Sequence, residues 1–281
     1  MIKQFSREDS MTVHPVPAKW DIDSIRRFWN YHGRKAQDET EYFSFQVGEA
    51  LVRLLKRARV LSRPVSVLDF GCGPGFLLEH FLNIGTTSFG FDFSDGTVAK
   101  VNQKFASRSN WKGAISATAL PTAYDDASFG LITCVETLEH LLDEMIPPTL
   151  HELHRLLEPE GILFITTPFA EDLQKSSIYC PFCDHEFHKV QHVRSFDSEA
   201  MSELLSQHGF DVIYCRNVDL FEIQSRGGWD RHSLKKSLKR VFHAVADLLA
   251  PVTSADGKYL LPRCSSGPNL CVIARKRESK G

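Results

Sequence analysis

Residues 65–76, VSVLDFGCGPGF, join a short apolar run to a cluster of glycines. Residues 65–68 predict a short buried strand, because a brief apolar run rich in β-branched residues and ended by glycine is typical of such strands. Asp69 stands at the carboxyl end of this strand, and the pattern FLLEHFLNI predicts a helix from about Phe76. A strand, a glycine turn and a helix together predict the first half of a βαβ unit.

The glycine turn contains Gly71, Gly73 and Gly75 in a G-x-G-x-G spacing. Ligands of open α/β sheets bind outside the carboxyl ends of the strands. Glycine lets the backbone come close to a ligand there and adopt conformations that a side chain would forbid. Phe76 stands where a dinucleotide site of the G-x-G-x-x-G type would have its third glycine, so the spacing indicates a ligand of another kind.

With the acid before it, the run D-x-G-x-G-x-G from Asp69 to Gly75 resembles the first motif of class I S-adenosylmethionine (SAM)-dependent methyltransferases. The segment LLEPEGILFITTP at 156–168 is similar to a later segment of the same family. The resemblance covers about residues 60–215 and 267–276. It implies an α/β, Rossmann-like fold, in which a seven-stranded, mostly parallel sheet has an antiparallel last strand and helices on both faces. It also implies that the protein is an enzyme.

The cofactor implied by the resemblance is SAM. Asp92 follows a second predicted strand, 87–91, and lies 21 residues past Gly71, where an acid can accept hydrogen bonds from the ribose hydroxyls. Phe93 could lie against the adenine. The family commonly has an aspartate near Ser116, and the backbone or Thr118 could substitute for it. The predicted cofactor residues are Asp69, Gly71, Cys72, Gly73, Gly75, Asp92, Phe93, Ser116, Thr118 and Val135.

The length of 281 residues, with 42% hydrophobic residues, suits one large α/β domain with additions. We expect an N-terminal arm and helical cap in 1–59, the methyltransferase domain in 60–277 and a tail in 278–281. Two insertions are predicted inside the domain: a lid at 170–196 that is rich in cysteine and histidine, and a basic amphipathic segment at 217–266. In the second insertion, residues 231–249 could contact an anionic substrate or a membrane surface, or pack on the core as an ordinary helix.

The chain contains no apolar run near the ~20 residues that span a bilayer, and its N-terminus has no apolar signal region. Seven cysteines, an odd number, indicate reduced thiols or metal ligands rather than disulfides. We therefore expect a cytoplasmic protein without a transmembrane segment. The net charge of −2 argues against a nucleic-acid partner, because nucleic-acid-binding proteins normally carry a clear basic footprint.

A second informative pattern is Glu136-x-x-Glu139-His140, which follows a predicted fourth strand. On a helix these positions would share one face, and that face would look over the methyl donor. Two carboxylates and an imidazole suit a divalent ion such as Mg²⁺ or Mn²⁺. The pattern resembles the metal ligands of ubiquinone-biosynthesis O-methyltransferases and of small-RNA 3′-terminal 2′-O-methyltransferases, where a further histidine follows the fifth strand. His192 holds that place. Alternatively, Glu139-His140 is a surface turn and Glu136 touches the methionine part of the cofactor.

A metal site of this kind would have a chemical purpose. An alcohol oxygen is a poor nucleophile at neutral pH, and a metal that binds the hydroxyl lowers its pKa and orients it for attack. Without a metal, His140 or His192 could act as the general base.

A third pattern is Cys180-x-x-Cys183 with histidines close behind it, a spacing typical of zinc ligands. Cys180, Cys183 and His188 could hold a structural Zn²⁺ in the lid, with His185, His192 or Cys264 as the fourth ligand. Reduced cysteines in a packed loop, or a redox pair, are the alternatives. If zinc took His192, the catalytic metal site would lose a ligand.

The function that these patterns favour is SAM-dependent O-methylation of a hydroxylated small molecule or glycan, with or without a divalent metal. One alternative is a 2′-O-methyltransferase for RNA 3′ ends, which would share the E-x-x-E-H pattern. The other is a non-catalytic SAM-binding scaffold.

Overall fold

The computed structural model describes residues 16–34, 39–117, 119–227, 252–261 and 264–278. Four sequence-based predictions fall wholly or partly outside these residues. They are the amphipathic segment 231–249 with its suggested membrane contact, the cofactor residue Thr118, residues 1–15 of the N-terminal arm, and residues 279–281 of the tail.

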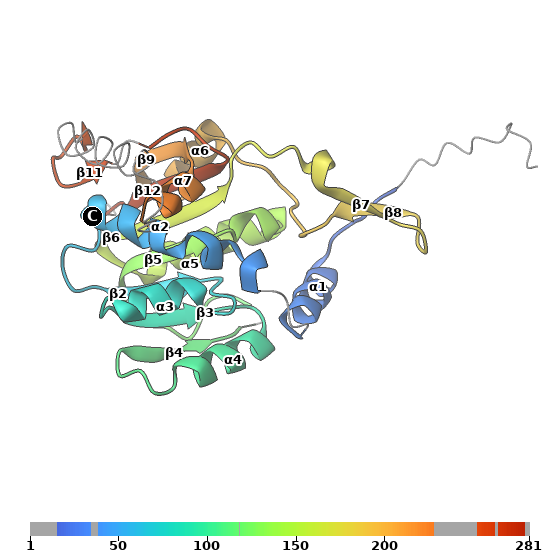
Figure 1. Ribbon diagram of the computed structural model, residues 1–281, viewed down its shortest axis with the longest axis horizontal. Helices are drawn as coiled ribbons and strands as arrows, with labels where there is room; N and C mark the ends of the chain where they lie inside the picture. Colours follow the sequence, from blue (N-terminus) through green and yellow to red (C-terminus); the bar gives the residue numbers. More distant parts are fainter. Residues whose placement is uncertain (1–15, 35–38, 118, 228–251, 262–263, 279–281) are drawn as a thin grey trace, which may run out of the picture.

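A seven-stranded sheet forms the centre of the molecule, in the order β4-β3-β2-β5-β6-β12-β9 (Figure 1). Neighbouring strands are parallel, except that β12 runs antiparallel to both β6 and β9. The predicted fold class is therefore confirmed. The bounds of the strands are β2 Ser66–Phe70, β3 Thr87–Phe91, β4 Trp111–Ile115, β5 Phe129–Val135, β6 Leu157–Pro168, β9 Phe210–Val218 and β12 Asn269–Lys276.

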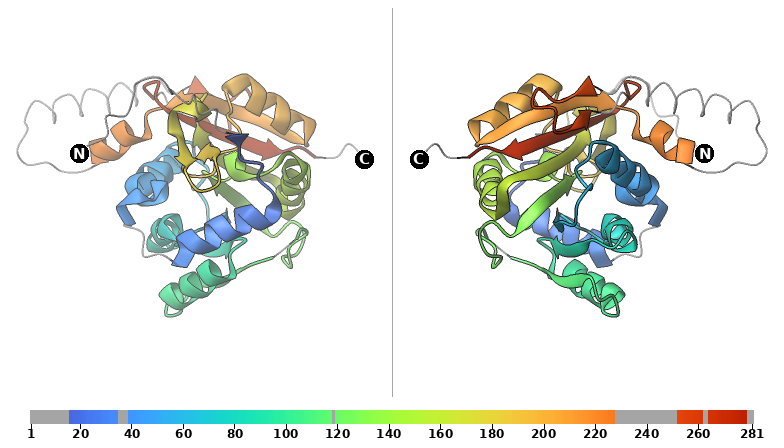
Figure 2. Two further views of the ribbon diagram at one scale, coloured as in Figure 1. Left: turned by 90° about the vertical axis from the view of Figure 1, so that its right-hand side faces the viewer. Right: turned by 90° about the vertical axis from the view of Figure 1, so that its left-hand side faces the viewer.

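Helices cover both faces of this sheet. In β6, Ile162 and Phe164 pack into one cluster with helices α2 and α3, whereas Leu163 and Ile165 pack into another with α5 and α6. Figure 2 shows α2 and α3 on one side of the sheet and α5 on the other. A strand that buries both sets of alternate side chains is typical of parallel sheets. The helices are α2 Phe43–Arg57, α3 Phe76–Asn83, α4 Asp95–Phe105, α5 Ile146–Leu156 and α6 Ser198–Gln207.

The glycine turn between β2 and α3 has the backbone that its sequence predicts. Gly71, Gly73 and Gly75 have φ angles of 83°, 48° and 79°, which side-chain-bearing residues rarely adopt. A Cβ atom on Gly71 would also lie 2.4 Å from the hydroxyl oxygen of Thr137. The turn therefore needs glycine for its conformation and for its close packing against the loop after β5.

The predicted N-terminal cap contains α1 (Ile22–Arg34), the 3₁₀ turn η1 (Glu39–Glu41) and α2. Residues Val16–Pro17, which we expected in a loose arm, form strand β1 and pair in parallel with β8 (His185–His188). Strands β8 and β7 (Ser177–Cys180) make an antiparallel hairpin in the predicted lid, preceded by η4 (Leu173–Ser176). The hairpin and α1 lie at the same end of the molecule (Figure 1).

The second predicted insertion contributes α7 (Leu220–Gly227), β10 (Val252–Thr253) and β11 (Leu260–Leu261) to the part of the chain that is described. Among the described residues, no helix combines the length and the apolar character that crossing a bilayer would need.

Candidate active site

Asp92 links the glycine turn to the loop after β3. Its Oδ2 accepts a hydrogen bond from the Gly73 N–H at 3.0 Å, and its Oδ1 accepts one from the Ser94 N–H at 2.9 Å. A Cβ atom built on Gly73 would meet no atom within 4 Å, so this part of the turn faces open space. Burial raises the pKa of Asp92. Asp92 thus stands beside an open backbone cradle, as its predicted role requires.

Two predicted cofactor residues have buried side chains. Asp69 accepts a hydrogen bond from the hydroxyl of Thr133 at 2.7 Å, and burial raises its pKa to about 7. The side chain of Cys72 packs into the cluster between α3 and α4, and its N–H donates to Phe91 O at 2.9 Å. In this arrangement Asp69 joins β2 to β5, and Cys72 contributes its backbone to the turn.

The remaining predicted cofactor residues lie beyond the ends of the neighbouring strands. Phe93 is half-buried, with its ring centroid 5.0 Å from that of Phe91. The hydroxyl of Ser116 donates to Asp95, in the first turn of α4. Val135 is half-buried at the end of β5. Direct contact of these residues with a cofactor stays a prediction.

The segment from Glu136 to His140 is not an α-helix, so the prediction of a shared helical face is wrong. Glu136 has a left-handed φ of 47°, and η2 (Leu138–His140) is a single 3₁₀ turn. The cause is pairing with β6: Glu136 N–H donates to Thr166 O at 2.9 Å, and Glu136 Oε1 accepts from Thr166 Oγ1 at 3.0 Å. The chain therefore stays beside β6 as far as Glu136 and turns there, which leaves no room for an α-helix before His140.

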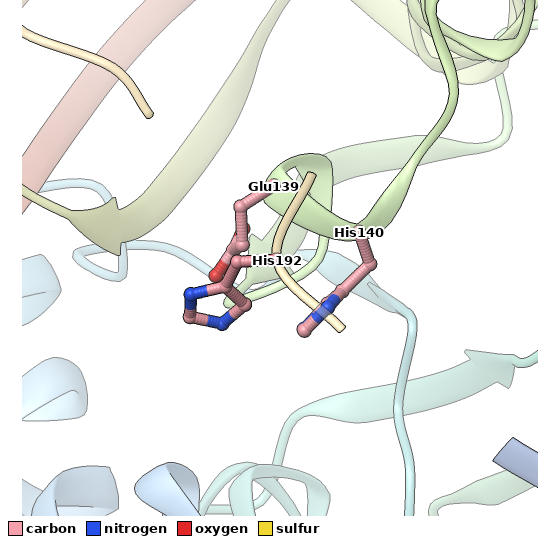
Figure 3. A group of neighbouring side chains, drawn as sticks. All are labelled: Glu139, His140 and His192. Atoms are coloured by element: carbon pink, nitrogen blue, oxygen red, sulfur yellow. The ribbon is translucent and has the colours of Figure 1, made fainter. Parts of the chain in front are cut away.

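Glu139, His140 and His192 nevertheless come together, with ligand atoms all within 4.8 Å of one another (Figure 3). Glu139 and His140 lie on η2, and His192 lies on the segment after the lid hairpin. A backbone hydrogen bond from Val193 N–H to Glu139 O, 2.9 Å, joins the two segments. Glu136, whose Oε1 is bound to Thr166, is not part of this group.

The carboxylate of Glu139 is the least satisfied group of the site. Its residue is 1% exposed, and among the described residues neither oxygen makes a hydrogen bond of normal length and angle, although the hydroxyl of Thr167 lies near enough to oppose the rise of its pKa. Burial raises the pKa of Glu139, and the charge of Glu136 raises it further; burial also raises the pKa of Glu136, to about 8. Buried carboxylates are normally paired, hydrogen-bonded or bound to metal, so this arrangement favours a cation.

The imidazole of His140 is neutral and belongs to the same group of side chains as Glu139 and His192. Its Nδ1 lies 3.3 Å from Gln191 O, which can only accept, so Nδ1 carries the proton and Nε2 keeps its lone pair. Burial lowers the pKa of His140 to about 3, with a further contribution from His192. Neutral imidazole is the form that binds a metal. Trp29 of α1 packs edge-on against this ring, with centroids 4.8 Å apart.

The predicted zinc set of Cys180, Cys183 and His188 is not assembled, which corrects that prediction. Cys180 pairs with His185 near the tip of the hairpin, whereas His188 pairs with Ser177 at the other end. His188 lies three residues along the strand from His185, a distance of about 10 Å, so it is too far from Cys180 to share an ion with it. Among the described residues, the groups dense enough to hold an ion are Glu139–His140–His192 and Glu171–His188–His192, and neither contains a cysteine.

The cysteine pair itself remains at the hairpin tip. The N–H groups of Phe182 and then of Cys183 lower the pKa of the Cys180 thiol. Cys264, considered as a fourth zinc ligand, instead packs with the core cluster on the α2 face.

Several residues of the site escaped sequence reasoning. Glu171, just after β6, binds His188 and His192, and the indole Nε1–H of Trp29 donates to Gln191 Oε1 at 2.7 Å. Asn30 and Ser94 are hydrogen-bonded at 3.2 Å. The available signal was weak: an acid three residues past Pro168, and a glutamine directly before His192.

The strand order, the antiparallel β12, the glycine turn and the acid after β3 define the fold of class I methyltransferases. The chain matches the family described as "Methyltransferase domain" over residues 32–214, and it belongs to that family.

The chain spans about half the length of the curated relatives it matches. It is 27% identical over 146 residues to a probable S-adenosylmethionine-dependent methyltransferase of Mycolicibacterium smegmatis, covering 52% of each chain. It is 33% identical over 107 residues to a ubiquinone biosynthesis O-methyltransferase of Actinobacillus pleuropneumoniae, covering 36% of this chain and 44% of the relative.

Solved structures show the same fold at low identity. The 1,6-didemethyltoxoflavin-N1-methyltransferase of Burkholderia thailandensis, crystallised with S-adenosylhomocysteine, is 17% identical with a TM-score of 0.58 and 94% coverage of both chains. A phosphoethanolamine N-methyltransferase of Haemonchus contortus, in complex with S-adenosyl-L-methionine, is 16% identical with a TM-score of 0.54, covering 90% of this chain and 60% of that one.

Proposed function

We propose that this chain transfers a methyl group from SAM to a hydroxyl oxygen of a small molecule or glycan, assisted by a divalent ion at Glu139, His140 and His192. The observation that carries the metal is the buried carboxylate of Glu139, which makes no hydrogen bond of normal length and angle among the described residues. The family membership and the cofactor cradle support the SAM part of the proposal.

The residues present fit SAM. Gly73 leaves open backbone space beside Asp92, whose carboxylate oxygens can each accept a further hydrogen bond from a ribose hydroxyl. When bound there, SAM would supply the methyl group. Phe93, the residue after Asp92, is half-buried, and we assign its ring to the adenine.

The residues present also fit a divalent ion. One carboxylate and two imidazoles form a mixed oxygen and nitrogen donor set, which suits Mn²⁺, Fe²⁺ or Zn²⁺ and, with added waters, Mg²⁺. An ion held there would lower the pKa of an acceptor hydroxyl and orient its oxygen. Vicinal diols and catechols could chelate it, which favours O-methylation. The naming of relatives as O-methyltransferases agrees with this choice.

The protein's own part is to position the reactants and exclude water. Trp29 places α1 against His140 and is anchored through Gln191, so this helix forms part of the wall of the site. Without a metal, His140 would be a weak base, because burial lowers its pKa to about 3, so the site favours the metal-assisted route. Alignment of acceptor and donor supplies much of the rate enhancement in such transfers.

The test is the variant Glu139→Gln, which removes the ligand charge and keeps the shape. We expect at least a 10-fold loss of Mn²⁺ affinity by calorimetry, loss of methyl transfer, and unchanged binding of S-adenosylhomocysteine. Glu144→Gln is the matched control, because Glu144 is an exposed acid of the same loop. Activity that survives both this variant and a chelator would exclude the metal.

Labelled SAM then distinguishes the acceptor classes. Methyl transfer to hydroxylated small molecules or glycans supports the proposal. Salt-dependent labelling of RNA 3′ ends would favour the RNA methyltransferase instead. Tight SAM binding without transfer to any acceptor would favour a scaffold.

A further inference from the structure

Glu171, His188 and His192 form a second compact group beside the first, and His192 belongs to both. Their ligand atoms lie within 4.8 Å of one another, a density that would fit a second metal ion. Glu171 is the centre of the group: its Oε1 lies 3.2 Å from His188 Nε2, and its Oε2 lies 2.5 Å from His192 Nδ1. The hydrogen bonds around the group decide between a metal and a proton-mediated contact.

The backbone determines the tautomer of His188. Its Nδ1 accepts hydrogen bonds from two backbone N–H groups, that of His192 at 3.2 Å and that of Val190 at 3.4 Å. A nitrogen that accepts must carry a lone pair, so the proton of the neutral ring is on Nε2. That N–H then donates to Glu171 Oε1. Because Nε2 carries this proton, it has no lone pair for a metal beside Glu171.

Glu171 in turn determines the tautomer of His192. The carboxylate Oε2 accepts a hydrogen bond from Nδ1–H, so the lone pair of His192 is on Nε2. Nε2 is the remaining ring nitrogen available to the group with Glu139 and His140. A carboxylate that holds the far nitrogen of a ligating histidine sets the tautomer and the orientation of the ring.

Backbone contacts hold the segment that carries Glu171, three residues past the end of β6. The preceding Ala170 has a left-handed φ of 47° and donates its N–H to Phe196 O at 2.8 Å. The next residue, Asp172, caps η4 by accepting from the Gln174 N–H. His188, stacked on His192 with ring centroids 4.4 Å apart, holds the other carboxylate oxygen.

We propose that Glu171 is a positioning residue, clamped by His188, that holds His192 in the Nδ1–H tautomer and directs its Nε2 lone pair to the ion site. This inference rests on the proposed metal-assisted function for its consequence, but the tautomer itself is independent of any metal. The group of Glu171, His188 and His192 then supports the ion site through hydrogen bonds and does not bind a second metal ion.

The first experiment reads the tautomers directly, by ¹⁵N-edited NMR of the histidine rings in the full chain without added metal. In the wild type we expect Nδ1–H on His192 and Nε2–H on His188. In Glu171→Ala, His192 should lose its Nδ1–H preference, and Asp172→Ala should leave it unchanged. A His192 ring that keeps Nδ1–H in Glu171→Ala would overturn the inference.

The second experiment measures Mn²⁺ binding by calorimetry and the affinity for S-adenosylhomocysteine. We expect one Mn²⁺ per wild-type chain, about 10–100-fold weaker binding in Glu171→Ala, and unchanged S-adenosylhomocysteine binding in both. Glu171→Gln keeps an acceptor oxygen for only one of the two histidine rings, so its Mn²⁺ affinity should lie between those of the wild type and of Glu171→Ala. Two ions per wild-type chain, one of them lost in Glu171→Ala, would show a second metal site and overturn the inference.

The two proposals fail in different ways. A wild-type chain that binds no Mn²⁺ contradicts the metal part of the proposed function, while the NMR tautomers still decide the role of Glu171. Normal Mn²⁺ affinity in a folded Glu171→Ala variant contradicts the positioning role alone.

Discussion

Individual residues at the candidate site adopt backbone conformations that they do not prefer. Glu136, Ala170 and Gln191 have φ angles of 47°, 47° and 61°, and each belongs to the site or directly precedes one of its residues. A non-glycine residue in this region costs about 1–3 kcal/mol. The surrounding hydrogen bonds must therefore hold the site against local preference, as those of Thr166 and Phe196 do.

Asp69 gives a residue-scale prediction about pH. Its folded-state pKa of about 7 exceeds its unfolded value, so the folded chain keeps a proton that the unfolded chain releases. The free energy of unfolding should then fall as the pH rises from about 4 to about 7, by at most about 1.4 kcal/mol per pH unit from this group. Asp69→Asn should remove that part of the slope, measured by urea denaturation across this range.

The control for this measurement is Asp125→Asn, since Asp125 is exposed. A pH slope that is identical in the wild type and in Asp69→Asn would mean that Asp69 is ionised in the folded protein.

At the scale of elements, α1 connects the two halves of the site. Its neighbouring residues Trp29 and Asn30 make separate hydrogen bonds, Trp29 with Gln191, which directly precedes His192, and Asn30 with Ser94 beside Asp92. None of the α1 residues 22–32 is fully buried, so we expect this helix to open more easily than the core helices.

Trp29→Phe tests this attachment, because it keeps an aromatic ring beside His140 and removes the indole N–H. We expect the opening free energy of α1 to fall by about 1 kcal/mol, measured by amide hydrogen exchange, with unchanged S-adenosylhomocysteine binding. Trp111→Phe, in the cluster between α3 and α4, should leave α1 unaffected. Equal protection of α1 in all three proteins would refute the anchoring role.

Sequence patterns predicted most elements well because those elements follow local rules. The strand at 87–91 and the helix that begins at Phe76 both appear as expected. The helical reading of Glu136–His140 failed because a tertiary contact, the pairing of Glu136 with Thr166, overrides the spacing.

At the scale of the whole molecule, stability depends on a core on each face of the sheet. Phe164, in β6 between β5 and β12, is fully buried in the cluster beneath α2. By contrast, Phe182 at the tip of the lid hairpin is 97% exposed. The same residue type thus occupies the two extremes of burial.

This contrast gives a matched pair of variants. Phe164→Ala should lower the free energy of unfolding by about 3–5 kcal/mol, through lost burial and a cavity. Phe182→Ala should change it by less than about 0.5 kcal/mol. Urea denaturation measures both. Comparable losses in the two variants would mean that the hairpin tip is packed in solution.

The sequence does not predict which side chains meet at the site. His192 was found because a family resemblance placed it after the fifth strand. Glu171 has no motif, and it reaches His192 only because the lid hairpin folds back between them. The sequence spacing places His188 with the cysteines, yet the strand register puts it at the opposite end of the hairpin.

The left-handed residues around the site bear on protein engineering. Glycine at 170, where the alanine side chain is exposed, would relieve the backbone strain, and a selection scored only on thermal resistance would tend to accept it. The same exchange would loosen the chain that aims Glu171 and His192. Variants of this protein that tolerate heat better are therefore candidates for slower catalysts, and both properties should be screened together.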